Sequence, residues 1–150
     1  MSAIRVTLGW VAEATGGTLR GGDRDHEVGG VVTDSRAVQP GDLFIALRGP
    51  RFDAHDFVEE VLARGASAIV DAKADPTTRA GRGRPSGRPA SGLIEVADTL
   101  KALQDMAHAV RQAAATRLIA ITGSAGKTTT KETIAAFLET RFAVVKNKGN

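Results

Sequence analysis

Residues 117–131, Arg117-Leu-Ile-Ala-Ile-Thr-Gly-Ser-Ala-Gly-Lys-Thr-Thr-Thr-Lys131, pass from an apolar run through a glycine-rich loop to a lysine and three threonines. A run as apolar as residues 117–121 is typical of a parallel strand buried on both faces. Residues 126–140 have helical spacing, with Ile134, Phe137 and Leu138 on one face, and residues 142–145 predict the next strand. Strand, glycine loop, helix and strand in this order predict the beginning of an α/β nucleotide-binding domain.

The loop itself has the composition of a phosphate-binding loop. In such loops backbone N–H groups surround an anion, a lysine reaches the β- and γ-phosphates, and a Ser or Thr hydroxyl binds magnesium. The general motif would place its first glycine at Ile121, so this loop is a shortened form. The alternative is a glycine-rich turn without a ligand, but the flanking strand and helix favour phosphate binding. The predicted phosphate-binding residues are Gly123, Ser124, Ala125, Gly126, Lys127, Thr128 and Thr129, with Thr128 as the metal ligand. The catalytic role of Lys127 and Thr128 is implied by the family resemblance given below.

The preceding part of the chain mixes short strands and helices, which predicts a small mixed α/β domain over residues 1–97. Thr7 is an expected N-cap for a helix over residues 8–14, and Asp98 for one over 99–114. The second helix should begin residues 98–150, with Leu100, Leu103, Met106, Ala107 and Val110 on its apolar face. Further strands are predicted over 28–33, 42–47, 67–70 and 93–96, and a helix over 57–64.

Composition narrows the class of protein. With 150 residues, of which 42% are hydrophobic, the chain can bury a core. It has no cysteine, which excludes disulfides and thiolate metal sites. Its N-terminus has no apolar run of signal-peptide length, and no segment approaches the roughly 20 apolar residues that span a bilayer. We therefore expect a soluble, uncleaved protein without membrane insertion; a cytoplasmic location is implied only by the family resemblance given below.

The positive charge is concentrated in one segment. Residues 75–92 carry four arginines and one aspartate, so they account for the whole formal charge of +3. Their Gly, Pro, Arg and Ser content predicts a flexible surface loop. RNA binding is the alternative, but the segment has no aromatic side chain on which bases could stack. We expect no nucleic-acid partner.

Several motifs resemble those of the Mur ligase family, in the same order. The loop Thr122-Gly-Ser-Ala-Gly-Lys-Thr-Thr-Thr-Lys-Glu132 is similar to the family's ATP loop. Thr33-Asp-Ser-Arg36, residues 40–49, residues 52–57 and Gly65-Ala66 resemble motifs of its UDP-binding domain, although members usually have glycine at position 54 and threonine at 147. The serine after the first glycine and the Lys-Glu pair resemble the branch that adds D-alanyl-D-alanine.

The resemblance implies an ATP-dependent amide ligase that adds D-alanyl-D-alanine to UDP-N-acetylmuramoyl-tripeptide through an acyl phosphate, in peptidoglycan precursor synthesis. It also implies substrate contacts by Ser35, Arg36 and Asn150. On physical grounds, the guanidinium of Arg36 suits a phosphate and the hydroxyl of Ser35 suits a base or ribose. The alternative for these residues is a turn with an exposed Asp34–Arg36 ion pair.

One βαβ unit cannot complete a doubly wound sheet, so we expect an N-terminal fragment that is monomeric and does not catalyse ligation alone. We also expect exposed apolar side chains in its last third, at Leu118, Ile119, Ile121, Ile134 and Phe137. Three alternatives stay open. They are a stand-alone UDP-sugar or nucleotide-binding module, another P-loop ATPase or kinase, and a Mur ligase that adds a different stem residue.

Overall fold

The computed structural model describes residues 5–50, 52–73, 91–115 and 117–147. The chain divides into two compact units, Met1–Ala115 and Thr116–Asn150, and each is described by itself. Most of the predicted arginine-rich loop lies outside the described residues. Its last two positions, Ser91 and Gly92, are buried rather than exposed, and the Gly92 N–H donates to Ser67 Oγ over 3.0 Å.

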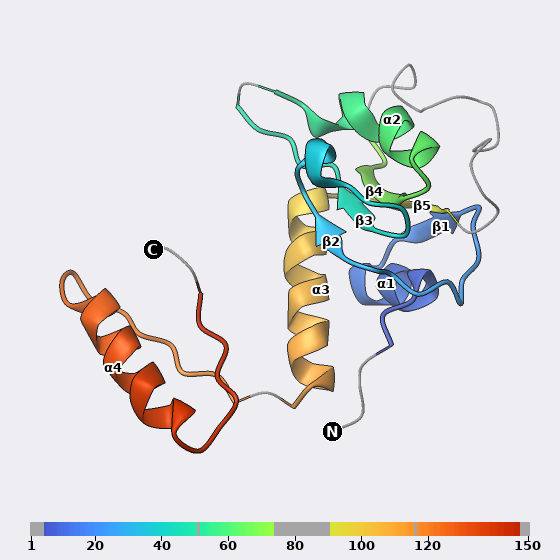
Figure 1. The fold of residues 1–150 in the computed structure, drawn as a ribbon. Helices are drawn as coiled ribbons and strands as arrows, with labels where there is room; N and C mark the ends of the chain where they lie inside the picture. The colour runs from blue at the N-terminus through green and yellow to red at the C-terminus, as the bar shows by residue number, and fades with distance from the viewer. Residues whose placement is uncertain (1–4, 51, 74–90, 116, 148–150) are drawn as a thin grey trace. The chain divides into compact units, whose positions relative to one another are not determined.

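A five-stranded mixed sheet forms the centre of the first unit (Figure 1). Its spatial order is β1-β5-β4-β3-β2, with β1 antiparallel to β5 and the other neighbours parallel. The predicted mixed α/β class is confirmed. The strands are β1 (Thr18–Arg20), β2 (Val31–Val32), β3 (Leu43–Ile45), β4 (Ser67–Asp71) and β5 (Leu93–Val96).

Helices cover both faces of this sheet (Figure 1). Side chains alternate along β3, so that Leu43 and Ile45 pack in one core cluster and Phe44 in the other. The first cluster includes residues of α1 (Leu8–Thr15) and α3 (Thr99–Ala113), and the second includes residues of α2 (Val58–Ala63). Two 3₁₀ turns, η1 (Ser35–Ala37) and η2 (Ala54–Phe57), complete the unit.

The predicted helix starts are confirmed by their caps. Thr7 accepts the N–H of Trp10, and Asp98 accepts the N–H of Lys101. The segment predicted as one helix over 57–64 is instead η2 followed by α2. The strands predicted over 28–33 and 42–47 are shorter than expected, since only the residues of β2 and β3 form ladder pairs.

Helix α3 departs from two expectations. We expected it to begin the second part of the chain, but it packs with α1 in the first unit, which ends at Ala115 instead of residue 97. We also expected Leu100, Ala107 and Val110 to face the core, but all three are exposed. Met106 is buried as predicted, and Ala102, which was not predicted, is also buried. Small Ala102 suits the close approach of two helices better than a bulkier side chain.

The second unit contains α4 (Lys127–Glu139), as predicted, but its two predicted strands are wrong. Residues 117–121 and 142–145 carry no strand assignment, because neither segment has a ladder partner among the described residues. The expected apolar exposure is confirmed at Leu118, Ile119 and Phe137, while Ile121 and Ile134 are partly buried. In the described part of the chain, no helix is long and apolar enough to cross a membrane.

Candidate functional site

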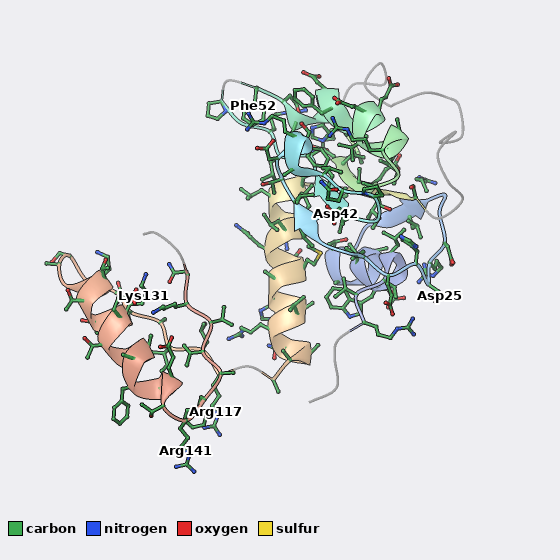
Figure 2. All side chains as sticks on the ribbon, viewed as in Figure 1. Asp25, Asp42, Phe52, Arg117, Lys131 and Arg141 are labelled. Carbon is green, nitrogen blue, oxygen red and sulfur yellow. The ribbon has the colours of Figure 1, made fainter. Side chains whose placement is uncertain are left out.

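A pocket of about 420 Å³ opens on the first unit. Two chain segments form its walls, and the fully buried Phe44 of β3 contributes to its lining between them. Phe52 lies on the loop that precedes η2 (Figure 2). The lining residues are Thr33, Asp34, Ser35, Arg36, Phe44, Phe52, Ala54 and Phe57.

The first wall is the turn that follows β2. Asp34 caps η1 by accepting the N–H of Arg36 over 3.1 Å, so the chain turns immediately after the strand. From the end of α2, an Arg64 guanidinium N–H donates to the carbonyl of Ser35 over 3.0 Å. Ser35 and Arg36, the two predicted substrate contacts within the described residues, therefore lie together on a fixed turn. The third, Asn150, lies outside those residues.

An ion pair joins Arg36 to Asp34, as the alternative for this turn had suggested. Arg36 Nε donates to Asp34 Oδ1 over 2.9 Å, and another guanidinium nitrogen donates to Oδ2 over 2.6 Å. These hydrogen bonds lower the pKa of the Asp34 carboxyl to about 2 and raise that of Arg36. The Arg36 side chain is 88% exposed. A guanidinium has five N–H donors, so donors remain to bind an anion beside the pocket.

The second wall is residues 52–57, which Asp53 organises. Its Oδ1 accepts the N–H of His55 over 3.0 Å, and its Oδ2 accepts Arg48 Nε over 2.7 Å. Partial burial raises the pKa of the Asp53 carboxyl, but the hydrogen bonds from His55 and Arg48 outweigh burial and leave it at about 2. Asp53 is thereby the N-cap of η2.

The pocket combines aromatic and polar groups. Phe52 and Phe57 are 62% and 40% exposed, unusually open for side chains of this size. They share the pocket with the hydroxyls of Thr33 and Ser35 and with the guanidinium of Arg36. This combination suits a planar ring that carries an anionic group. Neither phenylalanine was predicted as a site residue, because Phe57 fits the apolar face of the helix predicted over 57–64 and Phe52 has no local signal of its own. Two phenylalanines on either side of two acidic residues and a histidine were an available signal.

The second unit contains the predicted phosphate loop. Gly123 and Gly126 have positive φ values of 149° and 75°, which a residue with a Cβ rarely adopts. Gly126 is the N-cap of α4, and the Lys127 ammonium donates to the Gly123 carbonyl over 2.6 Å. Ser124 and Ala125 lie between the two glycines, and Thr128 and Thr129 are exposed in the first turn of α4.

This loop fits a phosphate group. Among the described residues, α4 has no side-chain cap and no acidic residue in its first turn, so its N–H groups and positive helix end can face an anion. Lys127 brings a cation to the same end of the helix. The described residues contain no cluster of three His, Cys, Asp or Glu side chains that could hold a metal. A threonine hydroxyl such as that of Thr128 can supply one oxygen to a magnesium ion whose other ligands are phosphate and water.

Comparison with known proteins identifies the family. Residues 27–111 match the family described as "Mur ligase family, catalytic domain". A UDP-N-acetylmuramoyl-tripeptide–D-alanyl-D-alanine ligase of Bacillus subtilis (strain 168) is 40% identical over 148 residues, which cover 98% of this chain and 30% of that relative. MurF from Acinetobacter baumannii superposes with a TM-score of 0.77 and 35% identity, covering 100% of this chain and 31% of that chain. MurF ligase from Thermotoga maritima, in complex with ADP, has a TM-score of 0.64 and 31% identity over 80% of this chain and 25% of that chain.

The Bacillus relative matches 98% of this chain, but the chain spans only 30% of that relative's length. The family match alone includes more than half of the chain, and it contains the complete pocket of the first unit. The solved structures are similar enough in sequence and in superposition for the likeness to extend beyond the general fold. The motif resemblance is confirmed, and this chain belongs to the Mur ligase family.

Proposed function

We propose that this chain is the N-terminal part of an ATP-dependent ligase that joins D-alanyl-D-alanine to UDP-N-acetylmuramoyl-tripeptide in cytoplasmic peptidoglycan precursor synthesis. The names of its relatives support this assignment. The chain spans 30% of the length of the Bacillus relative, so we assign to it only part of the enzyme's work. That part is to bind the UDP substrate and the phosphates of ATP. We expect it to act as a monomer, with D-alanyl-D-alanine bound by other parts of the enzyme.

The observation that carries the proposal is the pocket of the first unit. It brings the Ser35 hydroxyl and the Arg36 guanidinium beside two exposed phenylalanines. A uridine diphosphate presents a flat ring, a ribose with hydroxyls and a diphosphate, which match these groups in kind. We assign the ring to the aromatic wall and the diphosphate to Arg36, since a guanidinium binds phosphate oxygens through paired N–H donors.

The loop of the second unit has the complementary task. When bound, ATP with Mg²⁺ supplies the phosphoryl group that activates a carboxylate for amide formation. The backbone N–H groups at residues 123–126 and the end of α4 hold phosphate oxygens, Lys127 neutralises their charge, and Thr128 offers its hydroxyl to the metal. These residues bind and orient, because phosphoryl transfer depends mainly on positioning and charge stabilisation.

Calorimetric titration of the 150-residue chain tests both assignments. UDP-N-acetylmuramoyl-tripeptide and ATP with Mg²⁺ are titrated separately into the unaltered chain, Arg36→Ala and Lys127→Ala. We expect Arg36→Ala to weaken only the UDP compound and Lys127→Ala to weaken only ATP, because the two residues belong to different units.

A folded chain that binds ATP but no UDP compound would overturn the ligase assignment and favour another P-loop ATPase or kinase. Binding of the UDP compound without ATP would favour the non-catalytic UDP-sugar module. Equal affinity for UDP-N-acetylmuramoyl-dipeptide and the tripeptide would remove the preference for the D-alanyl-D-alanine branch over a ligase that adds another stem residue.

A further inference from the structure

His55 is a buried histidine that joins separate segments of the first unit. Its side chain is 3% exposed. One ring nitrogen, Nδ1, lies 2.5 Å from Asp53 Oδ1. The other, Nε2, accepts the backbone N–H of Asp71 at the end of β4, over 2.9 Å. The histidine therefore links the second wall of the pocket to the central part of the sheet.

These contacts define how the ring carries its proton. The backbone N–H of Asp71 can only donate, so Nε2 must be the unprotonated, accepting nitrogen. The ring proton is then on Nδ1, where it points at the Asp53 carboxylate. Asp53 in turn accepts Arg48 Nε, so a chain of hydrogen bonds runs from β4 through the histidine to residue 48.

This chain of hydrogen bonds fixes a segment that otherwise has few anchors in its exposed part. The Gly49 N–H donates to the Phe52 carbonyl over 2.9 Å, which closes the loop only on itself. The Ala54 N–H donates to Leu47 over 3.1 Å. Phe52 and Phe57 are on either side of the Asp53–His55 pair and both line the pocket. Because Phe52 is 62% and Phe57 40% exposed, packing alone holds these two residues less firmly than a buried position would.

We propose that His55, in its Nδ1–H form, is a positioning residue that sets the aromatic wall of the pocket for the base of a uridine nucleotide. This proposal rests on the proposed function. His55 does not touch the ligand; it acts through Asp53 and the backbone of residues 52–57. Anchoring the wall before binding reduces the ordering cost that the ligand would otherwise meet.

Two amide substitutions of His55 each remove one of its two hydrogen bonds and can keep the other. His55→Asn can keep a donor near Nδ1 for Asp53 but has nothing at Nε2 for Asp71. His55→Gln can place an acceptor near Nε2 for Asp71 but loses the donor to Asp53. His108→Asn, on the exposed side of α3, is the matched control. For each protein, affinities for UDP, uridine and inorganic pyrophosphate are measured by NMR titration, with thermal unfolding to establish folding.

We expect both His55 variants to bind UDP and uridine about tenfold more weakly, which corresponds to about 1.4 kcal/mol. Pyrophosphate affinity should not change, because Arg36 belongs to the other wall. His108→Asn should bind all three ligands as the unaltered chain does. Equal loss for pyrophosphate and uridine would indicate general damage to the fold and overturn the positioning role.

Ring ¹⁵N NMR of the unaltered chain gives an independent test that needs no variant to fold. The expected spectrum has a protonated Nδ1 and an unprotonated Nε2, and the opposite tautomer would refute the proposal. If the unaltered chain does not bind UDP, the proposed function itself fails. If it binds UDP and the His55 variants bind equally well, only the positioning role fails.

Discussion

Replacing Asp53 by Asn should destabilise the first unit about twice as much at pH 7 as at pH 3. The folded chain holds the Asp53 carboxylate with three hydrogen bonds, two from His55 and one from Arg48. Its pKa falls from 3.8 to about 2 because these bonds outweigh the effect of burial. The folded state therefore binds fewer protons than the unfolded state between these two pH values, and acid favours unfolding.

The size of the effect follows from the pKa change. A fall from 3.8 to about 2 corresponds to about 2.4 kcal/mol at 1.36 kcal/mol per pKa unit. The side chain is 31% exposed, so solvent screening reduces the expected contribution to about 1–2 kcal/mol. This stabilisation is present in full above about pH 5, and about half of it is lost by pH 3.

Urea unfolding from pH 3 to pH 7 measures this contribution, with the fluorescence of Trp10 in α1 as a probe inside the same unit. Asp53→Asn should lower the free energy of unfolding by about 1–2 kcal/mol at pH 7 and by about half as much at pH 3. Asp56→Asn, on the same turn and exposed, is the control. A loss that is the same at both pH values would refute the linkage to the Asp53 carboxylate.

Four other substitutions test the two sites and the core. Asp34→Asn should tighten UDP binding about threefold, and Arg36→Ala should weaken it about tenfold. Titration calorimetry measures both affinities. A change of affinity in the same direction for both variants would contradict the assignment of the diphosphate to Arg36. Lys127→Ala should weaken ATP binding about tenfold or more. The control Lys101→Ala, on α3, should leave the affinity for ATP unchanged. Ile69→Ala, at a fully buried position of β4, should cost about 2–5 kcal/mol in urea unfolding followed by circular dichroism, and a smaller loss would mean that the two faces of the sheet are less tightly packed than described.

Local signals in the sequence were sufficient where an element depends on its own residues. The caps Thr7 and Asp98 placed the starts of α1 and α3 correctly, because a cap is a contact between residues three positions apart. Gly16, in the left-handed region, ends α1 where the glycine pair predicted an end. The same reasoning found the residues of β4 and β5, whose apolar runs are bounded by glycines or acidic residues.

Elements that depend on distant partners were not predictable in this way. Strand β1 was missed because only Leu19 among its three residues is apolar, and pairing with β5 across more than 70 positions creates it. The strands predicted at 117–121 and 142–145 had the right apolar character, but a parallel strand exists only beside a hydrogen-bonded neighbour. The buried side of α3 was misassigned because its packing against α1 selects Ala102 over the larger Leu100.

The candidate sites show the same division. Ser35, Arg36 and residues 123–129 could be proposed from the sequence because each group is a short continuous motif. Residues 52–57 were found only as a motif of the family resemblance, and neither phenylalanine was proposed as a site residue, since the fold forms the pocket that Phe52 and Phe57 line with Arg36. The link between His55 and Asp71 joins positions 16 residues apart and has no local signal.

Topology explains why these particular segments meet. The Thr33–Arg36 turn directly follows β2, residues 46–57 follow β3, and Asp71 is the last residue of β4. Since β2, β3 and β4 are parallel neighbours, the segments that follow them all lie beyond the carboxyl ends of the strands. Binding sites of open α/β sheets form outside the carboxyl ends of their strands. The contact between His55 and Asp71 is then a consequence of strand order. Because β4 lies next to β3, the end of β4 is the neighbouring backbone to which the second wall can be anchored.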